Sequence, residues 1–156
     1  MWFVALFAAY FLEDACRMLN FVPSAESRKR SRDKDKEDGV GDEDDENLNK
    51  RVSDEYPVQV RNAMAQLNEK EINFELIEKI LDYVKGLEIS GAVLVFLPGW
   101  NLIFALLRHL QQHPVYGGAN YCILPLHSQL PREDQRRVFD SVPPHVMKVN
   151  ALIVAS

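Results

Sequence analysis

The chain has 156 residues, about the length of one domain, and its composition is 47% hydrophobic and 26% charged. That balance excludes a wholly disordered protein. The net charge is −5, but residues 26–51 alone hold 18 charged side chains, 8 basic and 10 acidic. Residues 57–156 hold 9 basic and 9 acidic side chains, which excludes a general positive field for nucleic acid. Any binding to nucleic acid would therefore depend on the local placement of a few groups.

The first apolar segment, residues 2–12, is an unbroken run of 11 residues. A membrane-spanning helix needs about 20 residues, and a secretory signal carries basic residues before its apolar stretch. The run has neither property, so we expect no membrane partner and interpret it as a buried strand or short helix. A secreted or membrane-tethered chain is the disfavoured alternative.

Cys16 and Cys122 belong to no CxxC or Cys/His cluster, which indicates two reduced thiols and no metal site.

Residues 24–51 form the next segment and have the composition of a disordered, solvated linker. Its basic half, from Arg28 to Arg32, could act as a nuclear import signal or as a phosphate-binding arm. Its acidic half, from Asp42 to Glu46, would partly cancel the attraction to phosphate. We therefore favour a plain solubilising loop, with nuclear import or RNA contact as the alternative.

Helical and strand patterns alternate after Pro57. A helix is predicted over residues 73–86, with Asn73 as its N-cap and Gly86 at its end. Its expected apolar face consists of Phe74, Ile77, Leu81 and Val84. Residues 92–97 form a continuous apolar run that ends in Pro-Gly. Such a run predicts a strand of a parallel sheet, buried on both faces.

The same order of elements then repeats along the chain. A helix is predicted over 101–113, a strand over 121–126, a third helix that has Pro131 at its first position, and a third strand over 149–155. We expect that third strand to present an apolar edge prone to aggregation. The alternation predicts an α/β fold with an incomplete doubly wound parallel sheet. Ligands of such sheets bind at the carboxyl ends of the strands.

No catalytic constellation is complete in the sequence. The motifs GxxxxGK[ST], GxGxxG and GxSxG are absent, so the chain has no P-loop of its own for nucleotide phosphates. His127 and Ser128 could be imagined as a base and a nucleophile. Neighbouring residues at a strand end point to opposite sides, however, which argues against a hydrolase.

Polar loops at the two strand ends are the remaining candidates. Gly99 permits close approach of a ligand to the backbone, and Trp100 could stack on a base or fill the core. Ser128 and Gln129 precede a helix whose first N–H groups form a natural phosphate site, or Ser128 simply caps that helix or a turn. Residues 136–137, both arginines, could reach an RNA backbone or pair with acidic neighbours on the helix.

Long blocks of this sequence resemble the second RecA-like domain of DEAH-box ATP-dependent RNA helicases. The blocks are residues 91–100, 123–131 and 135–139. Within that family, residues 10–14, the charged segment and residues 66–71 are similar to the RNA helicase A (maleless) type. The resemblance covers roughly residues 10–148, with motif IV at 94–100 and motif IVa at 126–139.

The resemblance implies which residues bind RNA. By that likeness Gly99, His127, Ser128 and Gln129 are expected to contact the strand through phosphate and sugar, without reading sequence. It implies no catalytic, cofactor-binding or metal-binding residue in this chain. ATP and magnesium are implied for the complete helicase, whose P-loop lysine and DEAH acid this sequence lacks.

The resemblance also implies a domain organisation. Residues 1–23 resemble the end of the first helicase domain, 24–51 form the linker, and 52–156 form an incomplete C-terminal RecA-like domain. We therefore expect a truncated piece of a nuclear, and also cytoplasmic, helicase that has no ATPase activity alone and lacks its partner domain. The alternative is a non-enzymatic short isoform that binds RNA or protein.

Overall fold

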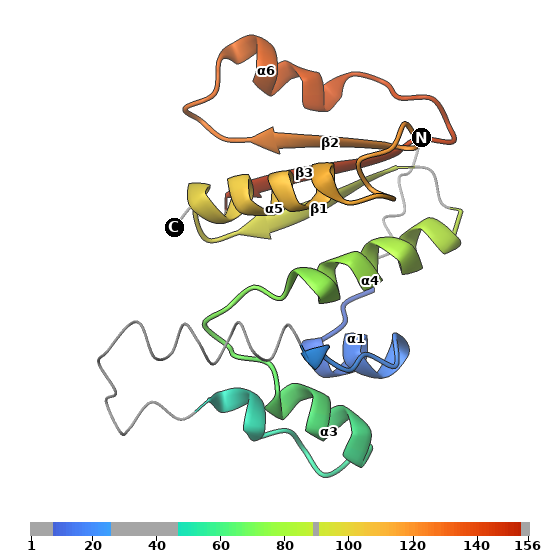
Figure 1. Cartoon of the computed structure of the whole chain (residues 1–156), viewed down its shortest axis with the longest axis vertical. Coiled ribbons are helices and arrows are strands. Elements are labelled where there is room, and N and C mark those ends of the chain that lie inside the picture. Colours follow the sequence, from blue (N-terminus) through green and yellow to red (C-terminus); the bar gives the residue numbers. More distant parts are fainter. Residues whose placement is uncertain (1–7, 26–46, 89–90, 154–156) are drawn as a thin grey trace, which may run out of the picture. The chain divides into compact units, whose positions relative to one another are not determined.

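The computed structural model describes residues 8–25, 47–88 and 91–153. Residues 2–7 of the apolar run and most of the expected linker, including its basic cluster, lie outside the described residues. The elements, labelled in Figure 1, are α1 (Leu12–Met18), η1 (Leu48–Lys50), α3 (Val58–Ala65), α4 (Phe74–Gly86), β1 (Ala92–Leu97), α5 (Trp100–Gln112), β2 (Tyr121–Leu126), α6 (Arg132–Arg136), η2 (Arg137–Phe139) and β3 (Met147–Ile153).

The chain divides into two compact units, residues 1–83 and 84–156, with the boundary inside α4. The first unit is helical in its described part, and α1 packs against α3. Its core joins residues from both sides of the charged segment: Cys16, Phe21, Val60, Met64, Leu67 and Leu76. The assignment of residues 1–23 and 52–156 to two different helicase domains stays a prediction.

Two sequence expectations need correction in the first unit. Tyr10 and Phe11 are 63% and 75% exposed, so the end of the apolar run is not buried, and α1 begins only at Leu12. The last residues of the expected linker (24–51) are not part of a disordered segment, because η1 packs against α3. The side-chain amides of Asn47 and Asn49 donate to the Leu67 carbonyl oxygen at 2.7 and 3.1 Å, two residues after α3 ends at Ala65.

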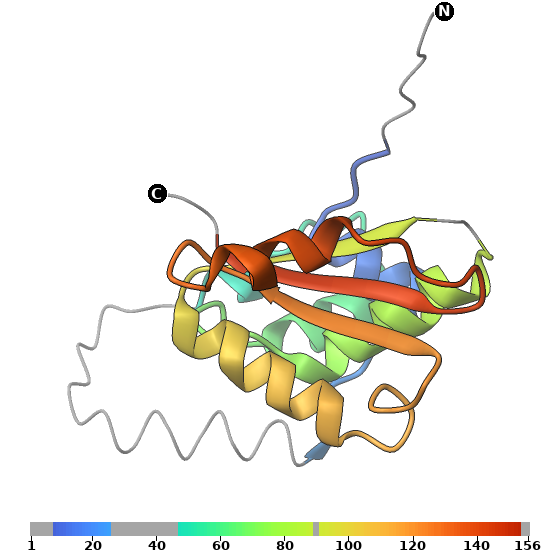
Figure 2. The ribbon, with the colours of Figure 1, turned by 90° about the horizontal axis from the view of Figure 1, so that it is seen from above.

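The second unit contains a three-stranded parallel sheet with the order β1-β3-β2. In register, Leu94 of β1, Asn150 of β3 and Leu124 of β2 lie side by side. Seen from above, the strands lie between α5 on one face and α6 on the other (Figure 2). This arrangement confirms the predicted α/β class, and it is consistent with part of a RecA-like domain.

The position of the strands in the sheet corrects two further expectations. β3 is the central strand, with Val149 fully buried and Ala151 only 1% exposed, so the apolar third strand is not an edge. β1 lies at an edge instead. On its face opposite α5, Leu94 and Phe96 are 52% and 57% exposed, so β1 is not buried on both faces. Its burial alternates along the strand, as expected for a half-covered edge.

The predicted helices are largely confirmed, with changes in detail. Asn73 caps α4, because its Oδ1 accepts a hydrogen bond from Leu76 N at 2.9 Å, and α4 ends at Gly86. Of the expected apolar face only Leu81 is buried, and Leu76, which lies outside that expected face, is buried as well. Four leucine and isoleucine side chains of α5 pack into the core of the second unit: Ile103, Leu106, Leu107 and Leu110.

Candidate nucleic-acid interface

The loop after β1 leads directly into α5. Gly99 precedes the helix in an extended conformation, with φ −175° and ψ 159°, which any residue can adopt. A Cβ at Gly99 would meet no atom within 4 Å, so the space beside this backbone is open. Gly99 occupies the N-cap position and has no side chain to cap α5, so it supplies no side-chain acceptor to the first N–H groups of the helix.

The loop after β2 is held in a defined turn by its own side chains. The ring of His127 accepts a hydrogen bond at Nδ1 from Gln129 N, at 3.0 Å. This bond leaves Nε2 as the donor of the neutral ring. Ser128 and Gln129 are exposed at the tip of the turn, and His127 is half-buried.

The two loops meet at one end of the sheet. Parallel strands place their carboxyl ends at the same edge, and the arrowheads of β1 and β2 point to the same end in Figure 1. The rings of Trp100 and His127 lie 4.9 Å apart between centroids, with an interplanar angle of 45°. This contact connects the first residue of α5 to the residue that follows β2.

The structure separates the alternatives that the sequence left open for this region. α6 has only five residues and Pro131, not Ser128, occupies its N-cap position, so a phosphate site at this helix terminus has little physical support. Arg137 lies 3.8 Å from Asp134 in an exposed ion pair, which favours the solvated helix face over a free cation at that position.

A residue that the sequence analysis did not single out holds the second loop. The side-chain amide of Gln135 donates to the carbonyl oxygens of Leu130 at 2.7 Å and of Ser128 at 3.4 Å. Gln135 therefore positions the backbone of the turn that carries the candidate residues. Its signal in the sequence is weak, because a glutamine on a polar helix gives no indication of what it contacts.

The groups at this edge can donate hydrogen bonds but form no catalytic set. Backbone N–H groups of α5, the Ser128 hydroxyl, the Gln129 amide and the His127 ring suit contacts to phosphate and sugar oxygens. Within the described ranges, no three His, Cys, Asp or Glu side chains are grouped so as to bind a metal ion. None of the described helices has the length and apolar composition needed to cross a membrane.

Known proteins show similarity over most of the chain, although no family model matches it. It is 30% identical to the DExH-box ATP-dependent RNA helicase DExH1 of Arabidopsis thaliana over 131 residues, which are 83% of this chain and 13% of that protein. It is 27% identical to the ATP-dependent DNA/RNA helicase DHX36 of Homo sapiens over 152 residues, 90% of this chain and 15% of that protein. The Arabidopsis helicase DExH6 matches at 34% over 87 residues.

The second unit is an α/β structure with a parallel sheet of the kind found in RecA-like domains. Among known proteins, the chain is distantly homologous to a portion of DExH-box helicases. It spans only 13–15% of the length of those relatives.

Proposed function

We propose that this chain is part of a DExH-box RNA helicase of the RNA helicase A (maleless) type. Its role is to contribute part of the RNA-binding face of the second motor domain, in the regions of motifs IV and IVa. The observation that carries the proposal is the contact between Trp100 and His127. Because of it, the loops after β1 and β2 form one continuous surface at the ligand-binding edge of a parallel sheet.

In this proposal four residues contact the RNA backbone: Gly99, His127, Ser128 and Gln129. Gly99 leaves the first turn of α5 accessible, and the other three supply neutral hydrogen-bond donors from an ordered turn. Such groups hold a strand in place without reading its bases. With equal numbers of acidic and basic residues in 57–156, binding by this chain alone is expected to be weak.

The complete helicase would supply what this chain lacks. ATP and magnesium would bind to the first RecA-like domain, which is the expected partner of this one, and the basic cluster at residues 28–32 would support a nuclear location with a cytoplasmic pool. Because the sequence has no P-loop, the chain alone is expected not to hydrolyse ATP. RNA-stimulated release of phosphate by the purified chain, above a protein-free control, would contradict this.

Binding of a fluorescent single-stranded RNA to the full chain tests the proposed interface. Gln129→Glu places a negative charge at the exposed tip of the turn, next to the proposed phosphates, and should weaken binding by about threefold to tenfold. Gln112→Glu is the matched control, since it makes the same change at the far end of the 13-residue α5, about 18 Å from its start. It should leave affinity unchanged.

Two results would count against this interface. The first is no measurable RNA binding by a folded chain, and the second is equal weakening by both glutamate variants, which would indicate only a general charge effect. Circular dichroism spectra of the three proteins establish that each is folded. A smaller salt dependence of binding for Gln129→Glu than for Gln112→Glu would indicate that position 129 is the nearer of the two to the phosphates.

A non-enzymatic binding module is the second candidate, and one observation favours it. Leu94 and Phe96 are more than half exposed on the sheet face opposite α5, where another protein surface could pack. This alternative requires a chain that is stable alone. A cooperative thermal unfolding transition of the full chain would support it, whereas a broad transition without cooperativity would reject it.

A further inference from the structure

An aromatic and basic stripe runs along one side of α5, starting at the candidate interface. Trp100, Phe104 and Arg108 are spaced four residues apart, so they share one side of the helix. The buried side of α5 is formed by other residues, such as Ile103 and Leu107. Phe104 is 46% exposed, so this stripe flanks the core rather than filling it.

Each side chain of the stripe contacts the next one along the helix. The ring centroids of Trp100 and Phe104 are 6.2 Å apart, and the guanidinium of Arg108 lies 5.3 Å from the centroid of Phe104. His127 extends the row at its other end through its contact with Trp100. Arg108 makes no ion pair with any residue in the described part of the chain, so its charge is not neutralised there.

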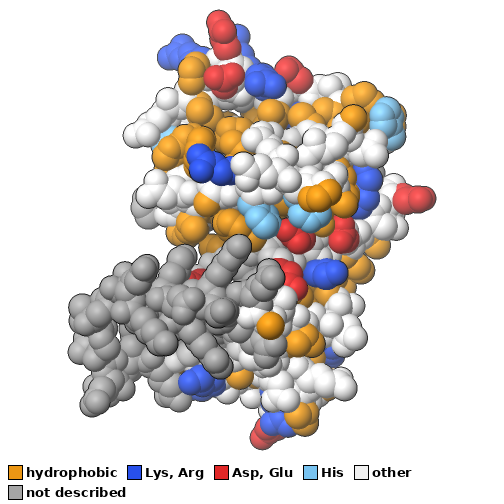
Figure 3. All heavy atoms as spheres, in the orientation of Figure 1, with side chains coloured by type: hydrophobic (Ala, Val, Ile, Leu, Met, Phe, Trp, Pro, Cys, Tyr) orange, Lys and Arg blue, Asp and Glu red, His pale blue; other side chains and the backbone are white. Residues whose placement is uncertain are grey.

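The molecular surface around the stripe has the same apolar and basic character. In the space-filling view, hydrophobic side chains gather over the surface formed by α5 and β2, with a basic side chain among them (Figure 3). Aromatic faces next to an uncompensated arginine are the combination that proteins use to hold unpaired bases beside a phosphate backbone.

We propose that Trp100, Phe104, Arg108 and His127 form a stacking surface for the unpaired bases of a single RNA strand. This rests on the proposed function and adds to it, because the strand-end loops hold the backbone and the stripe holds bases. Stacking uses the face that every base shares, so the surface binds without sequence preference. The competing explanation is that Arg108 and Phe104 pack only to stabilise α5, as residues four apart on a helix do.

The test compares two ligands that differ only in their bases. Full chain carrying Trp2→Phe, so that Trp100 is its single tryptophan, is titrated with a short oligouridine and with a strand of equal length that has the same sugar–phosphate backbone but no bases. The proposal expects oligouridine to quench Trp100 fluorescence and to bind roughly tenfold more tightly than the abasic strand, equivalent to about 1.4 kcal/mol.

Variants of Phe104 assign the effect to the stripe. Phe104→Ala and Phe104→Leu should both remove most of the preference for oligouridine, and Phe104→Leu keeps the apolar packing if the alanine variant folds poorly. Phe96→Ala is the matched control, because Phe96 has similar exposure on the opposite face of the sheet. It should retain the preference.

The outcomes separate this inference from the proposed function. Equal binding of both strands without quenching of Trp100 would overturn the stacking surface while leaving backbone contact by the loops intact. Binding of neither strand would overturn the proposed function itself. Loss of preference in Phe96→Ala to the same degree as in Phe104→Ala would also overturn the assignment to the stripe.

Discussion

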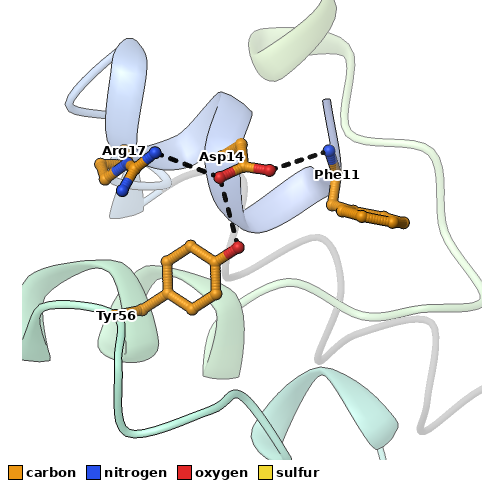
Figure 4. Close-up of polar contacts among 4 residues, drawn as sticks. All are labelled: Phe11, Asp14, Arg17 and Tyr56. Atoms are coloured by element: carbon orange, nitrogen blue, oxygen red, sulfur yellow. Dashed lines mark hydrogen bonds and ion pairs between the residues drawn. The ribbon is translucent and has the colours of Figure 1, made fainter. Parts of the chain in front are cut away.

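Tyr56 donates a hydrogen bond from its hydroxyl to Asp14 Oδ1 at 3.2 Å, across 42 positions of sequence. The same carboxylate accepts a hydrogen bond from Phe11 N at 3.2 Å and lies 3.3 Å from the guanidinium of Arg17 (Figure 4). Burial, and then the charge of Asp14, raise the pKa of Tyr56 above its usual value of 10.0. The parts of the chain before and after the charged segment are thus joined by a polar contact as well as by a shared core.

Removing the Tyr56 hydroxyl should lower the thermal stability of the first unit. Tyr56→Phe keeps the ring, which lies 5.8 Å from the guanidinium of Arg17, but it leaves Asp14 with one donor fewer. We expect the melting temperature to fall by a few degrees. Tyr83→Phe is the control, since Tyr83 is 41% exposed. A thermal melt by circular dichroism in which both variants behave alike would show that the hydrogen bond contributes nothing.

The two cysteines should differ strongly in reactivity. Cys16 is 1% exposed, and its thiol lies 3.8 Å from Met64 Sδ, whereas Cys122 is only partly buried. Because the thiolate is the reactive form, a thiol whose pKa is raised reacts slowly. We expect a thiol reagent to label Cys122 in the folded chain and Cys16 only after denaturation. Peptide mapping after a timed reaction measures this, and rapid labelling of Cys16 would mean that the α1 region opens readily.

Stability should fall at alkaline pH because of the same thiol. Burial, and then the charge of Glu13, raise the pKa of Cys16 from 9.0 to about 11. The unfolded chain therefore loses this proton first, and between these values the folded state binds more protons. The free energy of unfolding should drop by about 2 to 3 kcal/mol as the pH passes from below 9 to above 11.

Cys16→Ala isolates the contribution of the thiol to this pH dependence. The variant is less stable at every pH because it leaves a cavity, so the slopes of stability against pH are compared, not the absolute values. Tyr56 contributes in the same direction, since its pKa is also raised. Identical slopes for the variant and the natural chain would contradict the assignment to Cys16.

The local elements could be predicted because each has a local cause. Asn73 caps α4 in the structure as the sequence indicates, and Pro98 and Gly99 end the apolar run of β1 before α5 starts. The order of the strands could not be predicted, because it depends on pairing between distant segments. An apolar run such as residues 149–153 has the same sequence pattern whether its strand lies in the centre of a sheet or at its edge.

The candidate site, too, could be predicted from the sequence only in part. Ligands of parallel sheets bind at the carboxyl ends of the strands, and this rule indicated the loops after β1 and β2. Only the structure shows that Trp100 and His127 are in contact. A tryptophan at the start of an amphipathic helix is compatible with core packing and with an exposed flank, so the sequence left both open. Gln135 was missed because its partners are backbone carbonyls, which have no signature in the sequence.

A buried amide on the central strand offers a gain in stability. Asn150 is 3% exposed, and its Oδ1 has no hydrogen-bond partner among the described residues. Its register neighbours, Leu94 and Leu124, are apolar. Asn150→Leu should raise the free energy of unfolding by about 1 to 2 kcal/mol, because it removes an unpaired buried polar group. Asn150→Asp should lower it, and chemical denaturation of both variants checks the pair.

The uncovered face of β1 should make the chain self-associate. Leu94 and Phe96 are 52% and 57% exposed on an edge strand, and unprotected apolar edges promote association between sheets. Leu94→Gln with Phe96→Gln should lower the apparent mass in sedimentation velocity at high concentration, and reduce binding of a hydrophobic dye. The control is Phe139→Gln, which makes the same change at a residue that is 83% exposed outside the sheet. If Phe139→Gln alone removed the association, the contact would run through η2 and not through β1.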